Sequence, residues 1–350
     1  VFLLAVVPRD RGGSGFTMHI LRAESPGPNV GKLVPKVKTT AMILYGIYVV
    51  FTVIEIIALL IAGMPLFDSM TLTFGTVGTG GFGLLNSSIA SYSTAVQIII
   101  TVFMIICSIN FTVYYMFLIK RPKEALMCEE MRYYLLIVFG SALLIAFNIR
   151  ASFASFGKAF QQAIFQVASV ISTTGFATAD FNLWPEFSRM ILVLLMFVGA
   201  CAGSTGGGFK VSRLIIMVKS VRNEIMSVTH PRSVQKVHMD GRRIPDNVVK
   251  TVLCYLAGYV VILIVSVLLI SLDNFDMTTN FTAVMATFNN VGPGLNRVGP
   301  TGNFGGFSVL SKLVLMFDML VGRLELYPML VIFAPGLWRI HPHRHVGKVQ

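Results

Sequence analysis

Long apolar segments alternate along the chain with shorter segments in which apolar and polar residues are mixed. The long segments lie at about 39–62, 95–119, 133–150, 189–219, 249–272 and 308–336, and the short ones at 65–78, 156–172 and 275–290. A helix needs about 20 apolar residues to cross a bilayer. The long segments therefore predict spanning helices, and the short ones predict helices that enter the membrane and return. The pattern predicts an all-α polytopic membrane protein.

A glycine-rich turn follows each short segment, which gives three copies of one order: long helix, short helix, glycine turn, long helix. The turns read TVGTGGFG from 76, STTGFAT from 172 and FNNVGPGLN from 288, and they align on Gly81, Gly175 and Gly292. Glycine-rich backbone at membrane depth is tolerated where it is buried in protein or lines a watery path. Rings of backbone carbonyls can replace the water shell of a cation. The internal repeat therefore predicts a pore for a small dehydrated cation.

The predicted ion ligands are backbone carbonyls beside each key glycine, with one main selective site. In the last turn Gly294 competes with Gly292 as the key glycine, and Pro293 stiffens the turn because it lacks an N–H group. Each short helix would aim the partial negative charge of its C-terminus at the membrane centre, which favours a cation there. Ordinary glycine contacts between helices are the alternative interpretation. The predicted ion-binding residues are Thr79, Gly80, Gly81, Thr173, Thr174, Gly175, Asn290, Val291 and Gly292.

A second glycine run, Gly203-Ser-Thr-Gly-Gly-Gly208, interrupts the apolar segment 189–219. Three consecutive glycines disfavour a straight helix, and the spacing does not match the GxxxxGK[ST] phosphate loop. A plain helix hinge remains an alternative. We favour a flexible intramembrane loop that lies just below the glycine turns and obstructs the path.

Two charged residues stand inside apolar segments. Arg323 would cost roughly 2.5–3.5 kcal/mol at the membrane centre. It could hold carbonyls of the glycine loop, face the pore and repel cations, or form an ion pair with another helix. Its neighbours Glu325 and Asp318 are poorly spaced on a helix to be its partner. Glu55 is interpreted as facing lipid or an interface, and we assign it no role.

Composition and charge support a membrane location. The chain is 55% hydrophobic and 13% charged, about half of the ~25% charged residues of a soluble domain. Of its 28 Lys and Arg residues, 22 fall in four stretches between apolar segments, 8–38, 120–132, 210–250 and 339–350. Cytoplasmic loops carry the Lys/Arg excess, so these stretches are predicted to lie inside the cell. Basic residues placed between spans argue against nucleic-acid binding.

The sequence carries no pattern typical of an enzyme. There is no HExxH motif and no Ser/His/Asp arrangement. The four cysteines form no CxxC pair, so they are interpreted as small apolar residues and not as a metal or disulfide set. We expect neither an organic cofactor nor a transition-metal site.

Four groups of residues carry a resemblance to a known family. They are Leu21–Pro28 (LRAESPGP), the three glycine turns, Gly199–Lys210 (GACAGSTGGGFK), and Asn289–Leu295 (NNVGPGL) together with Gly322–Glu325 (GRLE). On these residues, nearly the whole chain resembles the TrkH/TrkG/KtrB family of potassium-uptake membrane subunits, with the closer likeness to its TrkH/TrkG branch.

The resemblance implies four helix–pore helix–helix units arranged pseudo-four-fold around a central pore, with potassium at the carbonyl filter. It implies a multi-pass protein of the bacterial inner membrane, surrounded by lipid, that forms a homodimer and is controlled by a cytoplasmic nucleotide-binding ring of the TrkA/KtrA type. It also gives the glycine loop the role of a gate. The predicted gate residues are Gly203, Ser204, Thr205, Gly206, Gly207, Gly208 and Arg323.

Two further expectations follow. Three units cannot close a four-fold ring, so we expect the opening helix and filter turn of the first unit to precede Val1. The division is then 1–38 for the end of the first unit and a cytoplasmic loop, 39–132, 133–248 and 249–350 for the other three. The alternative function is a cation-coupled secondary transporter of a small organic solute. Broken helices would fit that function, but the sequence offers no carboxylate pair or polar pocket for such a substrate.

Overall fold

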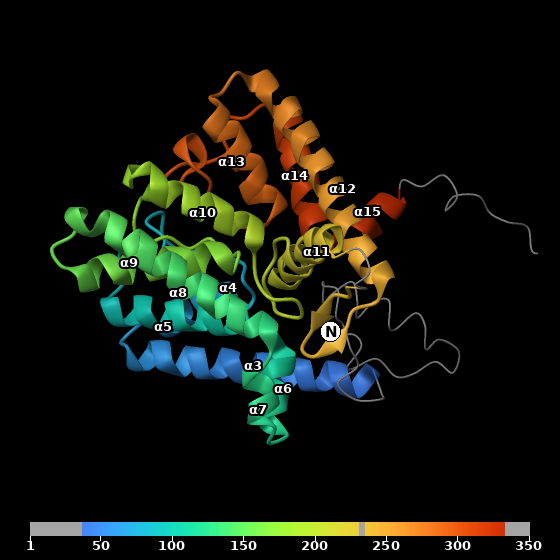
Figure 1. The fold of residues 1–350 in the computed structure, drawn as a ribbon. Helices are drawn as coiled ribbons and strands as arrows, with labels where there is room; N and C mark the ends of the chain where they lie inside the picture. Colours follow the sequence, from blue (N-terminus) through green and yellow to red (C-terminus); the bar gives the residue numbers. More distant parts are fainter. Residues whose placement is uncertain (1–36, 231–234, 333–350) are drawn as a thin grey trace, which may run out of the picture.

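The structure, a computed structural model, describes residues 37–230 and 235–332 and is mainly helical over them. Three groups of helices follow one another, here called the α3, α8 and α12 units (Figure 1). The α3 unit contains α3 (Val37–Ile61), α4 (Leu66–Val77), α5 (Thr94–Cys107), α6 (Phe111–Leu118) and α7 (Pro122–Leu126). The α8 unit contains α8 (Glu129–Ile149), η1 (Arg150–Ser152), α9 (Phe156–Ile171), η2 (Phe181–Leu183), α10 (Glu186–Val198) and α11 (Val211–Thr229). The α12 unit contains α12 (Asp246–Ile270), η3 (Ser271–Asp273), α13 (Met277–Phe288), η4 (Asn296–Val298), α14 (Val309–Leu324) and α15 (Leu326–Ile332).

Each unit opens with a long apolar helix and continues with a short one. The long helices α3, α8 and α12 have 25, 21 and 25 residues, and each is long and apolar enough to cross a membrane. The short helices α4, α9 and α13 have 12, 16 and 12 residues, so they are too short to span alone. The predicted alternation of spanning and re-entrant helices is confirmed.

The last helix of each unit is broken. The sequence predicted such a break only in the segment 189–219, where residues 199–210 separate α10 from α11. The prediction of continuous helices over 95–119 and 308–336 was wrong. The axes of α5 and α6 differ by 88°, because Asn110 accepts a hydrogen bond from Thr112 N (2.9 Å) and starts a new helix. The second break lies at Glu325, whose φ is 69°.

The short helices begin at residues that can start a helix. Ser155 accepts a hydrogen bond from Lys158 N (3.3 Å) at the start of α9, and Asp276 accepts one from Thr279 N (3.0 Å) at the start of α13. Helix α4 follows Pro65 and carries Asp68 in its first turn. The second half of each short helix is largely buried, so these helices are held inside the molecule and end near its centre.

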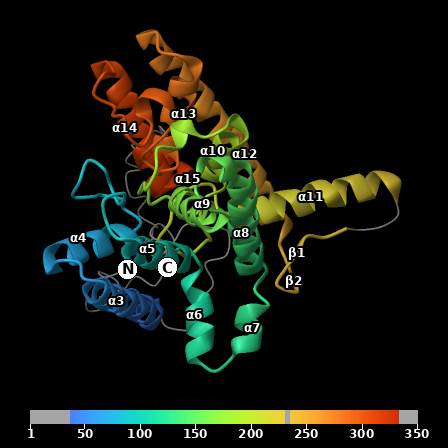
Figure 2. The ribbon, with the colours of Figure 1, turned by 90° about the vertical axis from the view of Figure 1, so that its left-hand side faces the viewer.

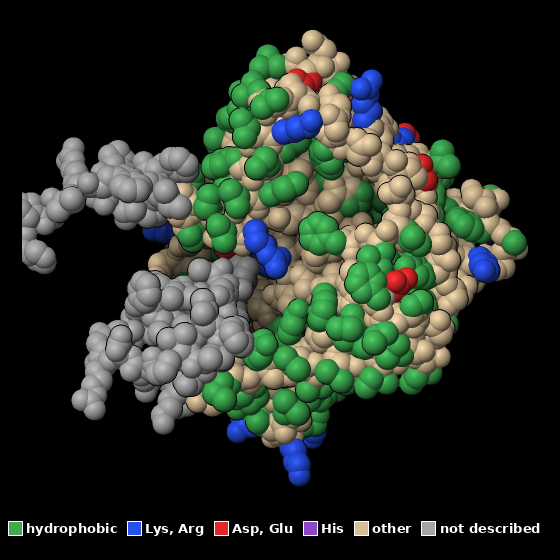
Figure 3. All heavy atoms as spheres, turned by 180° about the vertical axis from the view of Figure 1, so that it is seen from behind, with side chains coloured by type: hydrophobic (Ala, Val, Ile, Leu, Met, Phe, Trp, Pro, Cys, Tyr) green, Lys and Arg blue, Asp and Glu red, His purple; other side chains and the backbone are tan. Residues whose placement is uncertain are grey.

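Large apolar side chains also cover the outside of the helices. Ile61, Leu136, Leu194, Leu268 and Val309 are all more than half exposed. Hydrophobic side chains are spread over much of the face seen in Figure 3. Such a surface is unfavourable in water and suits a hydrocarbon surrounding.

Helix α11 differs from the other helices because it projects away from the helical body (Figure 2). Its buried residues all lie between Val211 and Ile216, at its first end. A short antiparallel hairpin, β1 (His238–Met239) with β2 (Arg242–Arg243), lies between α11 and α12 in the chain.

Candidate functional site

A turn with one backbone conformation ends each short helix. We name these turns the α4 turn (78–81), the α9 turn (172–175) and the α13 turn (289–292). In each, the second and fourth residues have a positive φ, and the residue between them does not. The pairs are Thr79 and Gly81 (51° and 68°), Thr173 and Gly175 (59° and 85°), and Asn290 and Gly292 (56° and 101°). A positive φ is uncommon for a residue with a side chain, so its recurrence at one position indicates a shared backbone requirement.

This conformation also decides the alignment of the last turn. Gly292 has the positive φ that marks the fourth residue, whereas Gly294 does not belong to the positive-φ glycines. The predicted choice of Gly292 as the counterpart of Gly81 and Gly175 therefore agrees with the backbone.

In each turn, the N–H groups of the third and fourth residues donate to a carbonyl of the preceding helix. In the α9 turn, the N–H groups of Thr174 and Gly175 both donate to the carbonyl of Ser169, at 3.0 and 3.2 Å. The carbonyls of Gly75 and Ala286 accept the corresponding pairs of N–H groups in the other two turns. Within residues 37–230 and 235–332, no hydrogen bond reaches the carbonyl oxygens of the nine predicted ion-binding residues. Those oxygens are free to coordinate a cation.

The turns pack against one another through their glycines. A Cβ atom at Gly81 would lie 1.6 Å from the carbonyl oxygen of Thr174, and one at Gly175 would lie 2.0 Å from that of Val291. No side chain fits at either position, so the three turns form a continuous arc. A Cβ atom at Gly292 would meet no atom of the described residues within 4 Å. Among residues 37–230 and 235–332, the arc is therefore open beyond the α13 turn.

The predicted loop lies directly against this arc. We name residues 199–210 the glycine loop. Thr79 Oγ1 donates to the carbonyl of Thr205 (2.8 Å), and Gly207 N donates to Thr173 Oγ1 (2.6 Å). A Cβ atom at Gly207 would lie 2.9 Å from the carbonyl oxygen of Asn289. The loop thus touches all three turns, and its glycines allow this close approach.

The other predicted loop residues shape the loop itself. Ser204 Oγ donates to the carbonyl of Cys201 (2.6 Å). A Cβ atom at Gly208 would lie 2.6 Å from the Cα atom of Gly199, so the two ends of the loop cross closely. Lys210 donates to the carbonyl of Gly206. These contacts keep the loop compact inside the membrane.

The break between α5 and α6 provides the opposite wall of the loop. The carbonyls of Cys107 and Ser108 accept hydrogen bonds from Thr205 N (3.4 Å) and Cys201 N (3.0 Å), and Phe111 N donates to the carbonyl of Gly203 (3.1 Å). The broken helix therefore satisfies backbone groups of the loop. The sequence reasoning missed this wall, although the polar residues Ser108 and Asn110 within an apolar segment were the available signal.

Arg323 reaches the glycine loop from the end of α14. Its Nη1 donates to the carbonyl of Thr205 (3.1 Å), the same oxygen that Thr79 contacts. In the described ranges, the ion pairs do not include Arg323. Glu325 pairs with Arg213, and Asp318 accepts from Ser266. Of the three predicted interpretations, holding a loop carbonyl is the one that this geometry supports.

The interpretation of Glu55 was wrong. This side chain is 0% exposed, so it faces neither lipid nor water. It lies near Thr76 of α4, and neither of its carboxylate oxygens has a hydrogen-bond partner among the described residues. Its position on α3 turns it inward, which the all-apolar surroundings in the sequence did not reveal.

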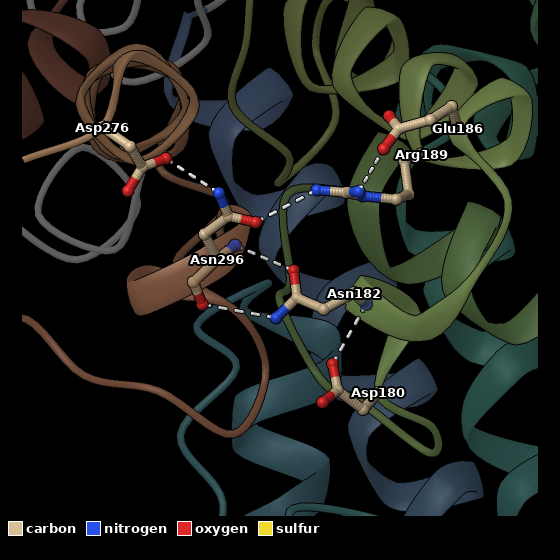
Figure 4. Close-up of polar contacts among 6 residues, drawn as sticks. All are labelled: Asp180, Asn182, Glu186, Arg189, Asp276 and Asn296. Atoms are coloured by element: carbon tan, nitrogen blue, oxygen red, sulfur yellow. Dashed lines mark hydrogen bonds and ion pairs between the residues drawn. The ribbon is translucent and has the colours of Figure 1, made fainter.

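Polar side chains join the α8 and α12 units beyond the turns (Figure 4). Asn182 and Asn296 bind each other twice: Asn296 N donates to Asn182 Oδ1 (2.8 Å), and Asn182 Nδ2 donates to the carbonyl of Asn296 (3.3 Å). Asn296 Nδ2 also donates to Asp276 (2.8 Å), and Arg189 donates to Asn296 Oδ1 (3.1 Å). We name this network the outer clasp; its members are Asp180, Asn182, Glu186, Arg189, Asp276 and Asn296.

A hydrogen bond from Thr279 holds the pKa of Asp276 below its ordinary value, and Asn296 adds to the effect. The outer clasp therefore has an ionised carboxylate at neutral pH. In residues 37–230 and 235–332, no three His, Cys, Asp or Glu side chains gather as a metal site.

Comparisons with known proteins agree with this geometry. The family model for TrkH, described as a cation transport protein, matches residues 13–340. The Trk system potassium uptake protein TrkH of Salmonella typhimurium is 35% identical over 330 residues, which is 92% of this chain and 67% of that protein. The potassium uptake protein TrkG of Escherichia coli K12 is 30% identical, over 97% of this chain and 70% of that protein.

A solved structure is similar over the same extent. The crystal structure of the potassium transporter TrkH from Vibrio parahaemolyticus matches with a TM-score of 0.82 at 33% identity, covering 93% of this chain and 69% of that one. The chain thus spans about two thirds of the length of these relatives. The family model covers most of the chain, and the fold agrees with it: this chain belongs to the TrkH family of cation transport proteins.

Proposed function

We propose that this chain forms the ion path of a potassium-uptake system in the bacterial inner membrane. One observation carries the proposal: three turns repeat a conformation in which the N–H groups are occupied and nine carbonyl oxygens accept no hydrogen bond among the described residues. Free carbonyl oxygens in a ring can replace the water shell of a cation. Potassium is the cargo in this proposal because relatives that match more than nine tenths of the chain are named potassium uptake proteins.

The glycine loop acts as the gate in this proposal. Three hydrogen bonds hold it against the path, from Thr79 and Arg323 to the Thr205 carbonyl and from Gly207 N to Thr173. Opening requires that these bonds break, and the loop contains enough glycine to change its backbone without large strain. The guanidinium of Arg323 next to the loop also repels cations while the loop is closed.

A fourth helix–pore helix–helix unit completes the ring. Gly81 and Gly175 each lie against the carbonyl of the next turn, whereas none of the described residues occupies the space beyond Gly292. A fourth turn of the same conformation would place the carbonyl of its third residue against Gly292. The glycine of that turn would in the same way lie against the carbonyl of Gly80. The division of the chain into units at 39–132, 133–248 and 249–350 belongs to this proposal, with its last two boundaries moved to the helix starts at Glu129 and Asp246.

Two partners complete the assembly. Helix α11 exposes an apolar stripe of Val218, Val221, Ile225 and Val228, which are 57–74% exposed and spaced as one helix face. A second copy of the chain covers this stripe in a homodimer. The stretch 210–250 holds nine Lys and Arg residues, and it forms the docking surface for a cytoplasmic nucleotide-binding ring.

The test is potassium uptake in a bacterium that lacks its own potassium-uptake systems. We would compare the 350-residue chain with the same chain joined to the upstream helix–pore helix–helix unit of a TrkH relative. We expect growth at low potassium with the joined form. Gly175→Ser in that form should abolish the growth, since a side chain cannot fit there, whereas Thr174→Val should preserve it because the carbonyl remains.

Two results would contradict the proposal. One is potassium uptake that is unaffected by Gly175→Ser in protein that reaches the membrane in normal amount. The other is uptake of potassium that an organic solute inhibits competitively, which would indicate a solute transporter.

A further inference from the structure

Glu130 is a buried carboxylate that lies beside the glycine loop. It is the second residue of α8 and is 3% exposed. Nothing in the sequence singles it out, because it stands at the end of an apolar segment among other charged residues. Its contacts lie 72 and 82 residues further along the chain.

One oxygen of Glu130 binds both ends of the glycine loop. Oε1 accepts a hydrogen bond from Ala202 N (2.7 Å), the residue before Gly203, and another from Ser212 N (3.1 Å), in the first turn of α11. The residues between these two points touch the three turns. Glu130 therefore ties both ends of the loop to α8 and leaves its centre to contact the ion path.

The groups around this carboxylate offset part of the cost of burying its negative charge. Ser212 N is one of the first N–H groups of α11, where the helix end carries partial positive charge. Lys210, 1% exposed, also lies close enough for its charge to act on Glu130. A buried carboxylate needs such partners. Loss of Glu130 would leave two buried N–H groups without an acceptor, at positions that bracket the gate.

We propose that Glu130 is a positioning residue of the gate, which fixes the resting place of the glycine loop by holding both of its ends. This inference rests on the proposed gating function of the loop. Opening of the loop requires the Ala202 bond to break or α8 to move with the loop. Removal of the carboxylate should therefore raise the fraction of open loop.

Cys201 offers a direct measurement of the loop position. It is 0% exposed and lies next to Ala202. The experiment uses the full chain in lipid nanodiscs with Cys107, Cys128 and Cys254 replaced by alanine. A positively charged methanethiosulfonate reagent modifies Cys201, and mass spectrometry follows the rate. Glu130→Ala should raise this rate roughly tenfold or more, corresponding to about 1.4 kcal/mol or more.

Two further variants separate positioning from general destabilisation. Glu129→Ala is the matched control. Glu129 lies next to Glu130 at the start of α8 and pairs with Lys219 of α11, but it does not touch the loop. This substitution should therefore leave the Cys201 rate unchanged. Glu130→Gln keeps an acceptor oxygen and should raise the rate less than Glu130→Ala. If Glu130→Ala does not fold, Glu130→Gln decides. A Cys201 modification rate in Glu130→Gln that equals the rate in the starting protein then overturns the proposal.

Ion flux through the joined form then distinguishes the two proposals. A faster Cys201 reaction with faster potassium leak supports both. A faster reaction with unchanged leak supports the positioning role of Glu130 and contradicts the gate function of the loop. An unchanged reaction in folded Glu130→Ala overturns the positioning role whatever the leak.

Discussion

The α9 turn and the α13 turn have the same backbone but different neighbours. Both have a positive φ at the second and fourth residues and give their N–H groups to the preceding helix. Gly175 of the α9 turn lies against the carbonyl of Val291, whereas Gly292 of the α13 turn has no such neighbour within the part of the chain that the structure describes. The conformation of a turn is therefore made by its own short helix. The arrangement of the turns around an axis depends on contacts between units.

The largest expected effect on the free energy of unfolding comes from adding a methyl group at Gly175 and, for comparison, at Gly292. Alanine at positive φ costs about 1–2 kcal/mol at either position. At Gly175 the methyl group also overlaps the Val291 carbonyl, which adds about 1–3 kcal/mol. Gly175→Ala should therefore lower the free energy of unfolding clearly more than Gly292→Ala does. Denaturation in detergent micelles measures both, and equal losses would show that the packing of the turns is unimportant.

The next effect concerns the side chains that hold the loop. Thr173 accepts from Gly207 N, whereas Asn290 at the same place in the α13 turn donates to the carbonyl of Met319 on α14. Thr173→Val leaves a buried N–H without an acceptor, at a cost of about 1–3 kcal/mol. We expect a raised potassium leak from the joined form with Thr173→Val. Asn290→Ala is the comparison: it should not raise the leak, and a similar rise in both would contradict this assignment.

A smaller effect is expected at the outer ends of the units. The α3 and α8 units are joined there partly by a backbone hydrogen bond, from Ile89 N to the carbonyl of Ala177 (3.0 Å). The α8 and α12 units are joined instead by the hydrogen bonds between Asn182 and Asn296 of the outer clasp. Asn182→Ala removes two hydrogen bonds and should cost about 1 kcal/mol, since the pair is exposed. Thermal unfolding would measure this loss. Ser88→Ala removes the side-chain bond to Ala177 N and should cost less, because the backbone bond remains.

The smallest effect depends on pH. The N-terminus of α9 is capped by Ser155, which does not titrate, and that of α13 by Asp276, whose pKa is lowered by Thr279. The stabilisation from a lowered pKa is present above the ordinary value of about 4 and is lost as the pH falls through the lowered value. Unfolding measured between neutral and acidic pH should show only a small loss of stability, because Asp276 is largely exposed and solvent screens its interactions. Asp276→Asn should reduce this pH dependence; an unchanged profile would assign it to other carboxylates.

The sequence predicted the parts that depend on local pattern. The three turns could be aligned because helix, glycine turn and helix recur in the same order, and the loop could be found because three glycines break an apolar segment. The breaks at Asn110 and Glu325 were missed because one or two polar residues hardly change the apolar character of a long segment. The inward side of Glu55 and the contacts of Glu130 could not be predicted, because both depend on helices far away in the sequence.

The use of backbone oxygens also bears on how such turns can evolve. The middle residues of the three turns are Gly80, Thr174 and Val291, which share no side-chain chemistry, yet each contributes the same carbonyl. Duplicated units could therefore diverge at this position without changing the atoms that an ion would meet. At Gly81 and Gly175, by contrast, the neighbouring turn leaves no room for a side chain. A search for similar turns in other chains should give more weight to the positive φ angles at the second and fourth residues than to the identity of the residues.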